Sequence, residues 1–198
     1  MPDLRTFIAV NVSPTKPLVH ILGRLADLGR PIRTVKGDHL HLTLQFRGPT
    51  DPAEVPAIEA AIRDAVTAAD ARPFDLPLQG LGAFPNDHRP NVIWVGCPDP
   101  GPLPQIVSHL PPPNTQPQDA IPQARNWQPH LTLARIKRRP GKPAGTPRGL
   151  IDLLSAHRQT VFGSARINSI ILFASELRPD GPEYTALATL GLPSPQTP

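Results

Sequence analysis

The sequence predicts an α+β fold in which two halves of one domain are built alike. Segments with helical spacing of apolar residues occur together with segments that alternate apolar and polar residues. A short strand motif also occurs once in each half of the chain. With 198 residues, of which 39% are apolar, the chain is long enough to bury a sizeable core.

Residues 5–70 contain two strand patterns and two helix patterns. Residues 5–12 are apolar on both faces for most of their length, which is typical of a central strand. Residues 17–28 have leucine and isoleucine at helical spacing. Residues 40–45 alternate Leu with polar side chains and predict a strand with one polar face. A second helix is predicted for residues 51–70, with a proline in its first turn.

From residue 74 onward the patterns are shorter and are separated by rigid loops, since the chain contains 29 prolines. We expect a single domain over residues 1–192, followed by a disordered tail at residues 193–198. The predicted elements are strands at 74–84, 91–97, 131–136, 161–162, 165–173 and 184–190, and short helices at 101–110 and 149–157.

Composition excludes several classes of protein. Cys97 is the single cysteine, so no intrachain disulfide can form, and no apolar run is long enough for a membrane span. The start of the chain does not resemble a signal peptide, so we expect a cytoplasmic protein. Nothing indicates an obligate oligomer, so we expect a monomer.

The net charge is +4, and residues 135–148 carry basic side chains without an acid. This basic run predicts contact with a phosphate-rich partner, although a solvated loop would have the same composition.

A four-residue motif is the strongest functional signal. His-Leu-Thr-Leu at residues 41–44 recurs at residues 130–133, about half the chain later. On a strand, the His and Thr of each copy share one face and the leucines share the other. If the halves pack about a pseudo-twofold axis, one cleft receives His41, Thr43, His130 and Thr132.

Two histidines in one cleft suggest acid–base chemistry at a phosphate. Imidazole can take and give protons near neutral pH, so one ring can act as the base and the other as the acid. The threonine hydroxyls can donate hydrogen bonds to phosphate oxygens. We therefore predict no metal and no cofactor. A zinc site that uses His39 and His41 is the competing interpretation, but the motif supplies no nearby Cys or acidic ligand apart from Asp38.

The sequence resembles the two-histidine phosphoesterases, in particular the RNA 2′,3′-cyclic phosphodiesterases also called 2′-5′ RNA ligases. The resemblance extends to about residue 192. It rests on RTFIAV at residues 5–10, HLTLQF at 41–46, GLGAFP at 80–85, RPNVIWVG at 89–96, PHLTLAR at 129–135, and SEL and GPEY within 175–184.

The resemblance implies a bilobal fold with two antiparallel sheets, helices outside and the active cleft between the sheets. It implies metal-independent hydrolysis of RNA 2′,3′-cyclic phosphate ends to 2′-phosphates. By the same resemblance His41 is the proton donor, His130 is the proton acceptor, Thr43 and Thr132 bind phosphate, and Arg135 adds positive charge. Strict alternation would place Arg135 on the leucine face, so this role requires a bulge or the end of the strand.

The sequence departs from the family at two positions next to the first motif. His39 stands where relatives often have Asn, and Arg47 stands where Leu is common. Two other functions stay open: ligation through a 2′-5′ bond by the reverse reaction, and binding of RNA ends without catalysis. We also expect Arg135, beside the second motif, to lower the pKa of His130 and so keep it neutral as the base.

Overall fold

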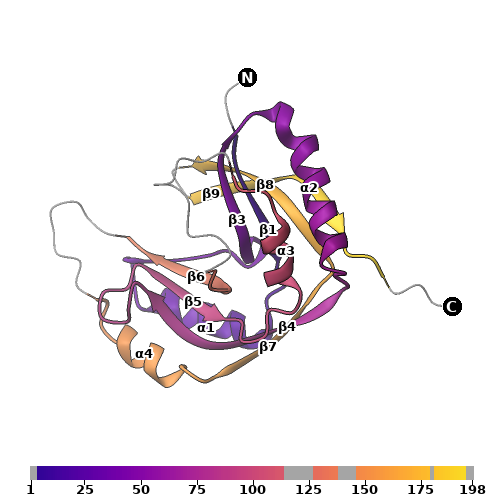
Figure 1. Ribbon diagram of the computed structural model, residues 1–198. Coiled ribbons are helices and arrows are strands. Elements are labelled where there is room, and N and C mark those ends of the chain that lie inside the picture. Colours follow the sequence, from indigo (N-terminus) through magenta and orange to yellow (C-terminus); the bar gives the residue numbers. More distant parts are fainter. Residues whose placement is uncertain (1–3, 114–126, 138–145, 179–180, 195–198) are drawn as a thin grey trace.

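The computed structural model describes residues 4–113, 127–137, 146–178 and 181–194, and Figure 1 shows its ribbon. The α-helices are α1 (Lys16–Asp27), α2 (Val55–Ala68), α3 (Leu103–His109) and α4 (Leu150–Ala156). The strands are β1 (Leu4–Asn11), β2 (Ile32–Thr34), β3 (His41–Thr50), β4 (Phe74–Phe84), β5 (Val92–Gly96), β6 (His130–Ile136), β7 (Val161–Ile167), β8 (Ser169–Arg178) and β9 (Gly181–Gly191).

The strands form two antiparallel half-sheets that meet at a single point. Their order is β7-β4-β5-β6-β3-β1-β8-β9, and β2 lies beside β6. Between β6 and β3, which join the halves, only Leu42 and Leu131 are paired. In Figure 1 the half-sheet of β3, β1, β8 and β9 stands at a steep angle to that of β6, β5 and β4. The predicted α+β class with two related halves is confirmed, and the two sheets are continuous through this one pair.

Helices cover the leucine face of each half-sheet. Helix α1 packs against β2, β6 and β7 and α4 packs against β4, whereas α2 contacts β9 and α3 contacts β3. The stripe predicted for α1 is buried, and the side chain of Thr15 caps this helix by accepting a hydrogen bond from the backbone N–H of Leu18. Leu42 and Leu131 are also fully buried. The opposite face, which carries the histidines and threonines, is therefore left for the site.

Two parts of the chain differ from the sequence prediction. The predicted single strand at 165–173 is wrong, because β7 ends at Ile167 and β8 begins at Ser169 in the other half-sheet. An unbroken apolar pattern does not reveal this change of partner strand. Strand β2 was not predicted, since it has only three residues. None of the described helices is long and apolar enough to cross a membrane.

Candidate active site

The two motif histidines are held in the same way. His41 and His130 each begin a strand, and the ring Nδ1 of each lies 2.7 Å from a backbone carbonyl oxygen two residues earlier, at His39 and Gln128 respectively. A carbonyl can only accept, so Nδ1 carries the hydrogen and donates it. Each imidazole therefore has its Nε2 available for proton transfer.

The strand register brings the two motifs together. Leu42 lies opposite Leu131 in an antiparallel pair. One residue to either side, the same register sets His41 across from Thr132, and His130 across from Thr43. Residues opposite each other on neighbouring antiparallel strands have Cα atoms about 4.5–5.5 Å apart. The structure thus gathers the four predicted motif residues into one group on one face of the sheet.

A bulge turns Arg135 to this same face. The register of β5 against β6 shifts by one residue between Ile93 and Trp94, so that Leu133 is the extra residue in β6. Ala134 is consequently buried with the leucines, and Arg135 is exposed on the face of His130. This bulge is the feature that the predicted role of Arg135 required.

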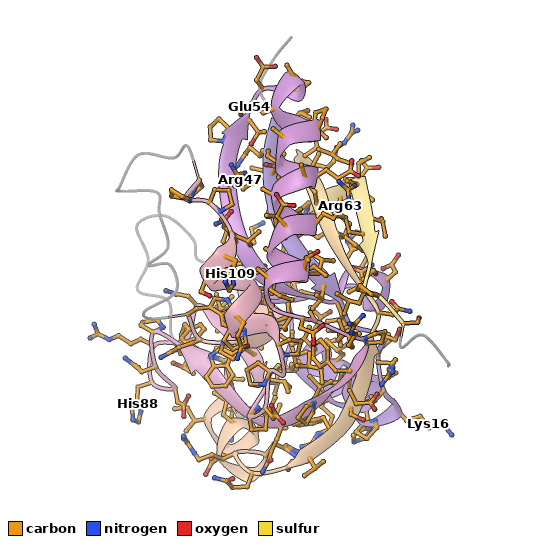
Figure 2. The ribbon with its side chains drawn as sticks, turned by 45° about the vertical axis from the view of Figure 1, so that its right-hand side comes forward. Lys16, Arg47, Glu54, Arg63, His88 and His109 are labelled. Carbon is orange, nitrogen blue, oxygen red and sulfur yellow. The ribbon has the colours of Figure 1, made fainter. Side chains whose placement is uncertain are left out.

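Strand β3 repeats the bulge in the other half. Its register against β1 shifts between Ile8 and Ala9, which makes Leu44 the extra residue. Phe46, five residues after His41 as Arg135 is five residues after His130, is exposed as a result. Arg47 is buried and donates to Gln45 Oε1 at 2.9 Å, and Figure 2 shows it on β3 next to α2. This departure from the family pattern therefore does not alter the histidine face.

Aromatic rings surround His41. Its ring centroid lies 5.0 Å from that of Phe7 and 5.2 Å from that of Tyr184, which meets it edge-on at 87°. His39 also contacts Tyr184, and the two ring centroids lie 5.2 Å apart. These contacts fix the orientation of the His41 ring. Nothing in the sequence motif itself indicates Tyr184, because strand β9 comes long after the motif in the chain.

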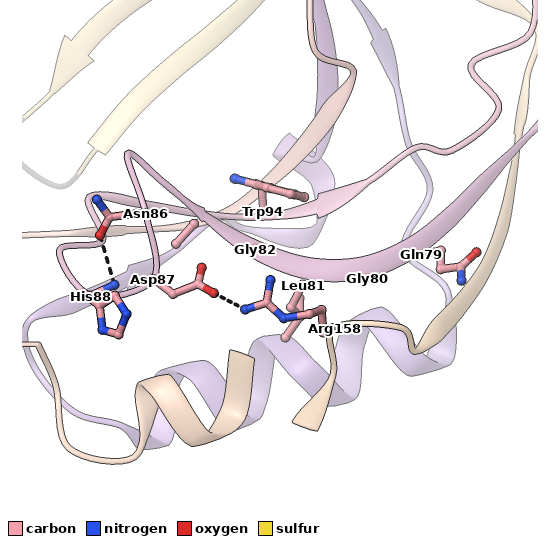
Figure 3. A pocket seen from close by; sticks show the side chains of 10 residues that line it. Gln79, Gly80, Leu81, Gly82, Asn86, Asp87, His88, Trp94 and Arg158 are labelled. Atoms are coloured by element: carbon pink, nitrogen blue, oxygen red, sulfur yellow. Dashed lines mark hydrogen bonds and ion pairs between the residues drawn. The ribbon is translucent and has the colours of Figure 1, made fainter. Parts of the chain in front are cut away.

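A different set of aromatic rings packs around His130. Phe84 meets its ring edge-on at 85° with the centroids 5.0 Å apart, and Trp94 packs against Phe84 at 5.3 Å. The indole of Trp94 covers Gly82, where a Cβ would clash with the ring (Figure 3). Only glycine fits at position 82 without displacing Trp94.

The cavity in Figure 3 is a separate feature of this half. It measures about 540 Å³, lies along the residues of β4 from Gln79 to Ala83, and contains an ion pair between Arg158 and Asp87. None of the five predicted site residues lines it. The predicted chemistry therefore belongs to the face between the motifs rather than to this cavity.

Burial lowers the pKa of both histidines. For His41 and for His130, desolvation is the largest cause, and the positive charge of Arg135 lowers the pKa of each ring further. The pKa of His41 is lowered additionally by His39 and His130. The expectation that Arg135 selects His130 as the neutral base is therefore not supported, because this cation acts on both rings.

These shifts predict an acidic optimum for the free enzyme. The profile of kcat/KM against pH reports the pKa values of the free enzyme, and catalysis needs one charged and one neutral imidazole. Because both pKa values lie below the ordinary 6.5, the singly protonated pair is most populated below pH 6.5 and is lost as the pH rises. Bound phosphate, being negative, raises both pKa values, so kcat should have its optimum at a higher pH than kcat/KM. A kcat/KM optimum above pH 7.5 would contradict this electrostatic description.

Other catalytic groups are poorly placed. Among the described residues, no group of three or more His, Cys, Asp or Glu side chains lies where it could hold a metal ion. Burial raises the pKa of the Cys97 thiol to about 12, which keeps it protonated and unreactive.

Trp127 ties the two motifs together near the site. The strands β3 and β6 share a single pair, and beside it the indole N–H of Trp127 donates to the backbone oxygen of Thr43 at 3.1 Å. We expect Trp127→Phe, which keeps a ring but removes the donor, to lower the free energy of unfolding by about 1 kcal/mol or more. Urea unfolding measures this loss. An unchanged midpoint and slope of the unfolding curve would mean that this hydrogen bond does not stabilise the contact between β3 and β6.

Comparisons with known proteins agree with this architecture. The family described as LigT like Phosphoesterase matches residues 8–94. A relative from Aeropyrum pernix named RNA 2′,3′-cyclic phosphodiesterase is 33% identical over 171 residues, which are 86% of this chain and 92% of the relative. A relative of the same name from Aquifex aeolicus is 32% identical over 94% of this chain and 96% of its own.

Solved structures agree as well. A crystal structure of a Thermus thermophilus protein superposes with a TM-score of 0.67 at 28% identity, over 97% of this chain and 100% of that one. Escherichia coli LigT in complex with phosphate has the same fold, with a TM-score of 0.61 at 23% identity over 97% and 99% of the two chains. The chain belongs to the LigT-like phosphoesterase family.

Proposed function

We propose that this protein hydrolyses the 2′,3′-cyclic phosphate at the end of an RNA chain to a 2′-phosphate, without a metal ion. The proposal is supported above all by the two imidazoles that lie on one face of the paired strands β3 and β6, each with Nδ1 hydrogen-bonded to a backbone carbonyl. Relatives at 33% and 32% identity bear the name of this activity. Since each half contributes one histidine, residues 1–192 would act as one catalytic domain.

The reaction requires two proton transfers at one phosphorus atom. Nε2 of His130 takes a proton from water, and the water oxygen forms a bond to phosphorus. The bond from phosphorus to the ribose 3′ oxygen breaks, and Nε2 of His41 gives its proton to that oxygen. Water is thus consumed, a 2′-phosphate and a 3′-hydroxyl are formed, and proton exchange with solvent restores both rings.

The remaining predicted residues stabilise charge on the phosphate. The hydroxyls of Thr43 and Thr132 lie across the strand pair from the histidines and would donate to the two non-bridging oxygens. Arg135, exposed on the same face, would oppose the negative charge that grows on these oxygens in the transition state. The positive charge of Arg135 acts on both catalytic histidines, since it lowers the pKa of each imidazole.

Product analysis tests this function against the two alternatives. The purified protein is incubated with a nucleoside 2′,3′-cyclic phosphate in the presence of EDTA, and the products are followed by phosphorus NMR. We expect complete conversion to the 2′-monophosphate. Conversion only after a divalent metal is added, or a 3′-monophosphate product, would contradict the proposal.

The same assay distinguishes hydrolysis from ligation and from simple binding of RNA ends. When an oligonucleotide with a 5′-hydroxyl is added, a ligase would form a 2′-5′ linked product at the expense of hydrolysis. An RNA-end-binding protein would leave the cyclic phosphate intact. We expect hydrolysis to dominate in water, because water is present at far higher concentration than any 5′-hydroxyl end.

A further inference from the structure

Two arginines from distant parts of the sequence lie side by side on the histidine face. Strand β2 pairs with β6 so that Arg33 is directly opposite Arg135. Residues opposite each other in an antiparallel pair point to the same side of the sheet. Their neighbours Ile32 and Ile136, which are also opposite each other, are buried in the core. Arg33 therefore accompanies Arg135 on the exposed face.

This pairing is unfavourable without a ligand. Like charges directly opposite on neighbouring strands destabilise a sheet. Both arginines are exposed, and neither forms an ion pair with any acidic side chain in the described part of the chain. An anion bound between the two guanidinium groups removes the repulsion, and the planar fork of arginine matches two phosphate oxygens.

The two arginines differ in their distance from the reacting centre. Arg135 influences the pKa of His41, His130 and Tyr184, whereas Arg33 is not among the charges that shift any of these three groups. Arg33, which lies one strand away from Arg135 on β2, therefore acts less strongly on the reacting centre than Arg135 does. An anion held by both side chains would occupy a position next to the reacting phosphate, not the position of that phosphate itself.

We propose that Arg33 and Arg135 form a second phosphate subsite, which holds the phosphodiester that precedes the cyclic phosphate in an RNA chain. The inference rests on the proposed function and specifies its substrate class. A free cyclic mononucleotide has no second phosphate at this place, whereas every oligoribonucleotide with a cyclic end has one. The preferred substrate is therefore an RNA chain end.

The test compares two substrates in three variants. Arg33→Ala should lower kcat/KM by about tenfold or more for an oligoribonucleotide with a cyclic end, as expected for loss of a charge-assisted hydrogen bond. It should leave turnover of the cyclic mononucleotide unchanged. Arg33→Lys should retain part of the preference. Arg63→Ala is the control, because Arg63 lies on α2 in an exposed ion pair with Glu59 and its loss removes the same charge elsewhere (Figure 2).

Salt dependence gives a second measurement. The slope of the logarithm of oligonucleotide affinity against the logarithm of salt concentration should fall by about 0.7 in Arg33→Ala, the share of one phosphate contact to a single strand. Equal loss on both substrates, or no loss on the oligonucleotide, would overturn the second subsite.

Binding experiments separate this inference from the proposed function. If the wild-type protein hydrolyses neither substrate, the proposed function fails. The subsite is then judged by binding of a 2′-phosphorylated oligonucleotide and of a 2′-mononucleotide, measured by calorimetry. Arg33→Ala must weaken the first and not the second, and any other result rejects the subsite.

Discussion

Replacing either His41 or His130 with alanine is expected to lower kcat by about 10²–10⁴-fold, the usual contribution of a positioned acid or base. Each ring is fixed by its Nδ1 bond and by an edge-on aromatic neighbour, so that Nε2 is presented at one place. Loss of either ring removes one of the two proton transfers. Steady-state kinetics on a nucleoside 2′,3′-cyclic phosphate measures the effect.

The histidine variants have a matched control within the chain. His109 is an exposed histidine on α3, and its Nδ1 also bonds a backbone carbonyl, that of Gln105 (Figure 2). We expect His109→Ala to keep wild-type turnover. The double variant of His41 and His130 should lose little more than the worse single variant, because the two rings act as a unit. Near-normal turnover in either single variant would refute the two-histidine mechanism.

Replacing Arg135 with alanine is expected to have the second-largest effect, a fall in kcat/KM of about 10²–10³-fold, as for loss of one group that stabilises an oxyanion. The pH profile should move as well. Because the charge of Arg135 lowers the pKa of His41 and of His130, its removal raises both pKa values and shifts the optimum to higher pH. A residue with a purely structural role would not produce this shift.

Arg135→Lys separates charge from geometry. Lysine keeps the positive charge but lacks the fork that contacts two oxygens at once. We expect this variant to keep the wild-type pH optimum and to lose part of the rate. An Arg135→Ala enzyme with an unchanged rate and an unchanged profile would remove Arg135 from the site.

The repeated motif allowed the central part of the fold to be predicted. The alternation of leucine with His and Thr is enough to say which face of β3 and β6 is buried, and Leu42 and Leu131 are indeed fully buried. The helical stripe of α1 was predicted for the same reason, since amphipathic spacing is a local property. The repetition predicted that both motifs contribute to one cleft, but not that their strands pair directly with each other, as Leu42 and Leu131 do.

What could not be predicted depends on contacts between distant segments. The bulge at Leu133 arises from the pairing of β5 with β6, and the sequence of β6 carries no sign of it. Arg33 reaches the site only through the register of β2, a strand too short to be recognised. The division between β7 and β8 likewise reflects a change of partner within one apolar stretch. The basic residues at 138–145 lie outside the described part of the chain, so their contact with RNA stays a prediction.

Dependence on the leaving group tests whether His41 is the acid and His130 is the base. Turnover of the cyclic phosphate is compared with turnover of an acyclic nucleotide ester whose leaving group is p-nitrophenolate, in His41→Ala and in His130→Ala. A good leaving group needs no acid. We expect the ester to restore turnover substantially in His41→Ala and not in His130→Ala. Restoration in His130→Ala alone would show that the roles are reversed, with His130 as the acid and His41 as the base.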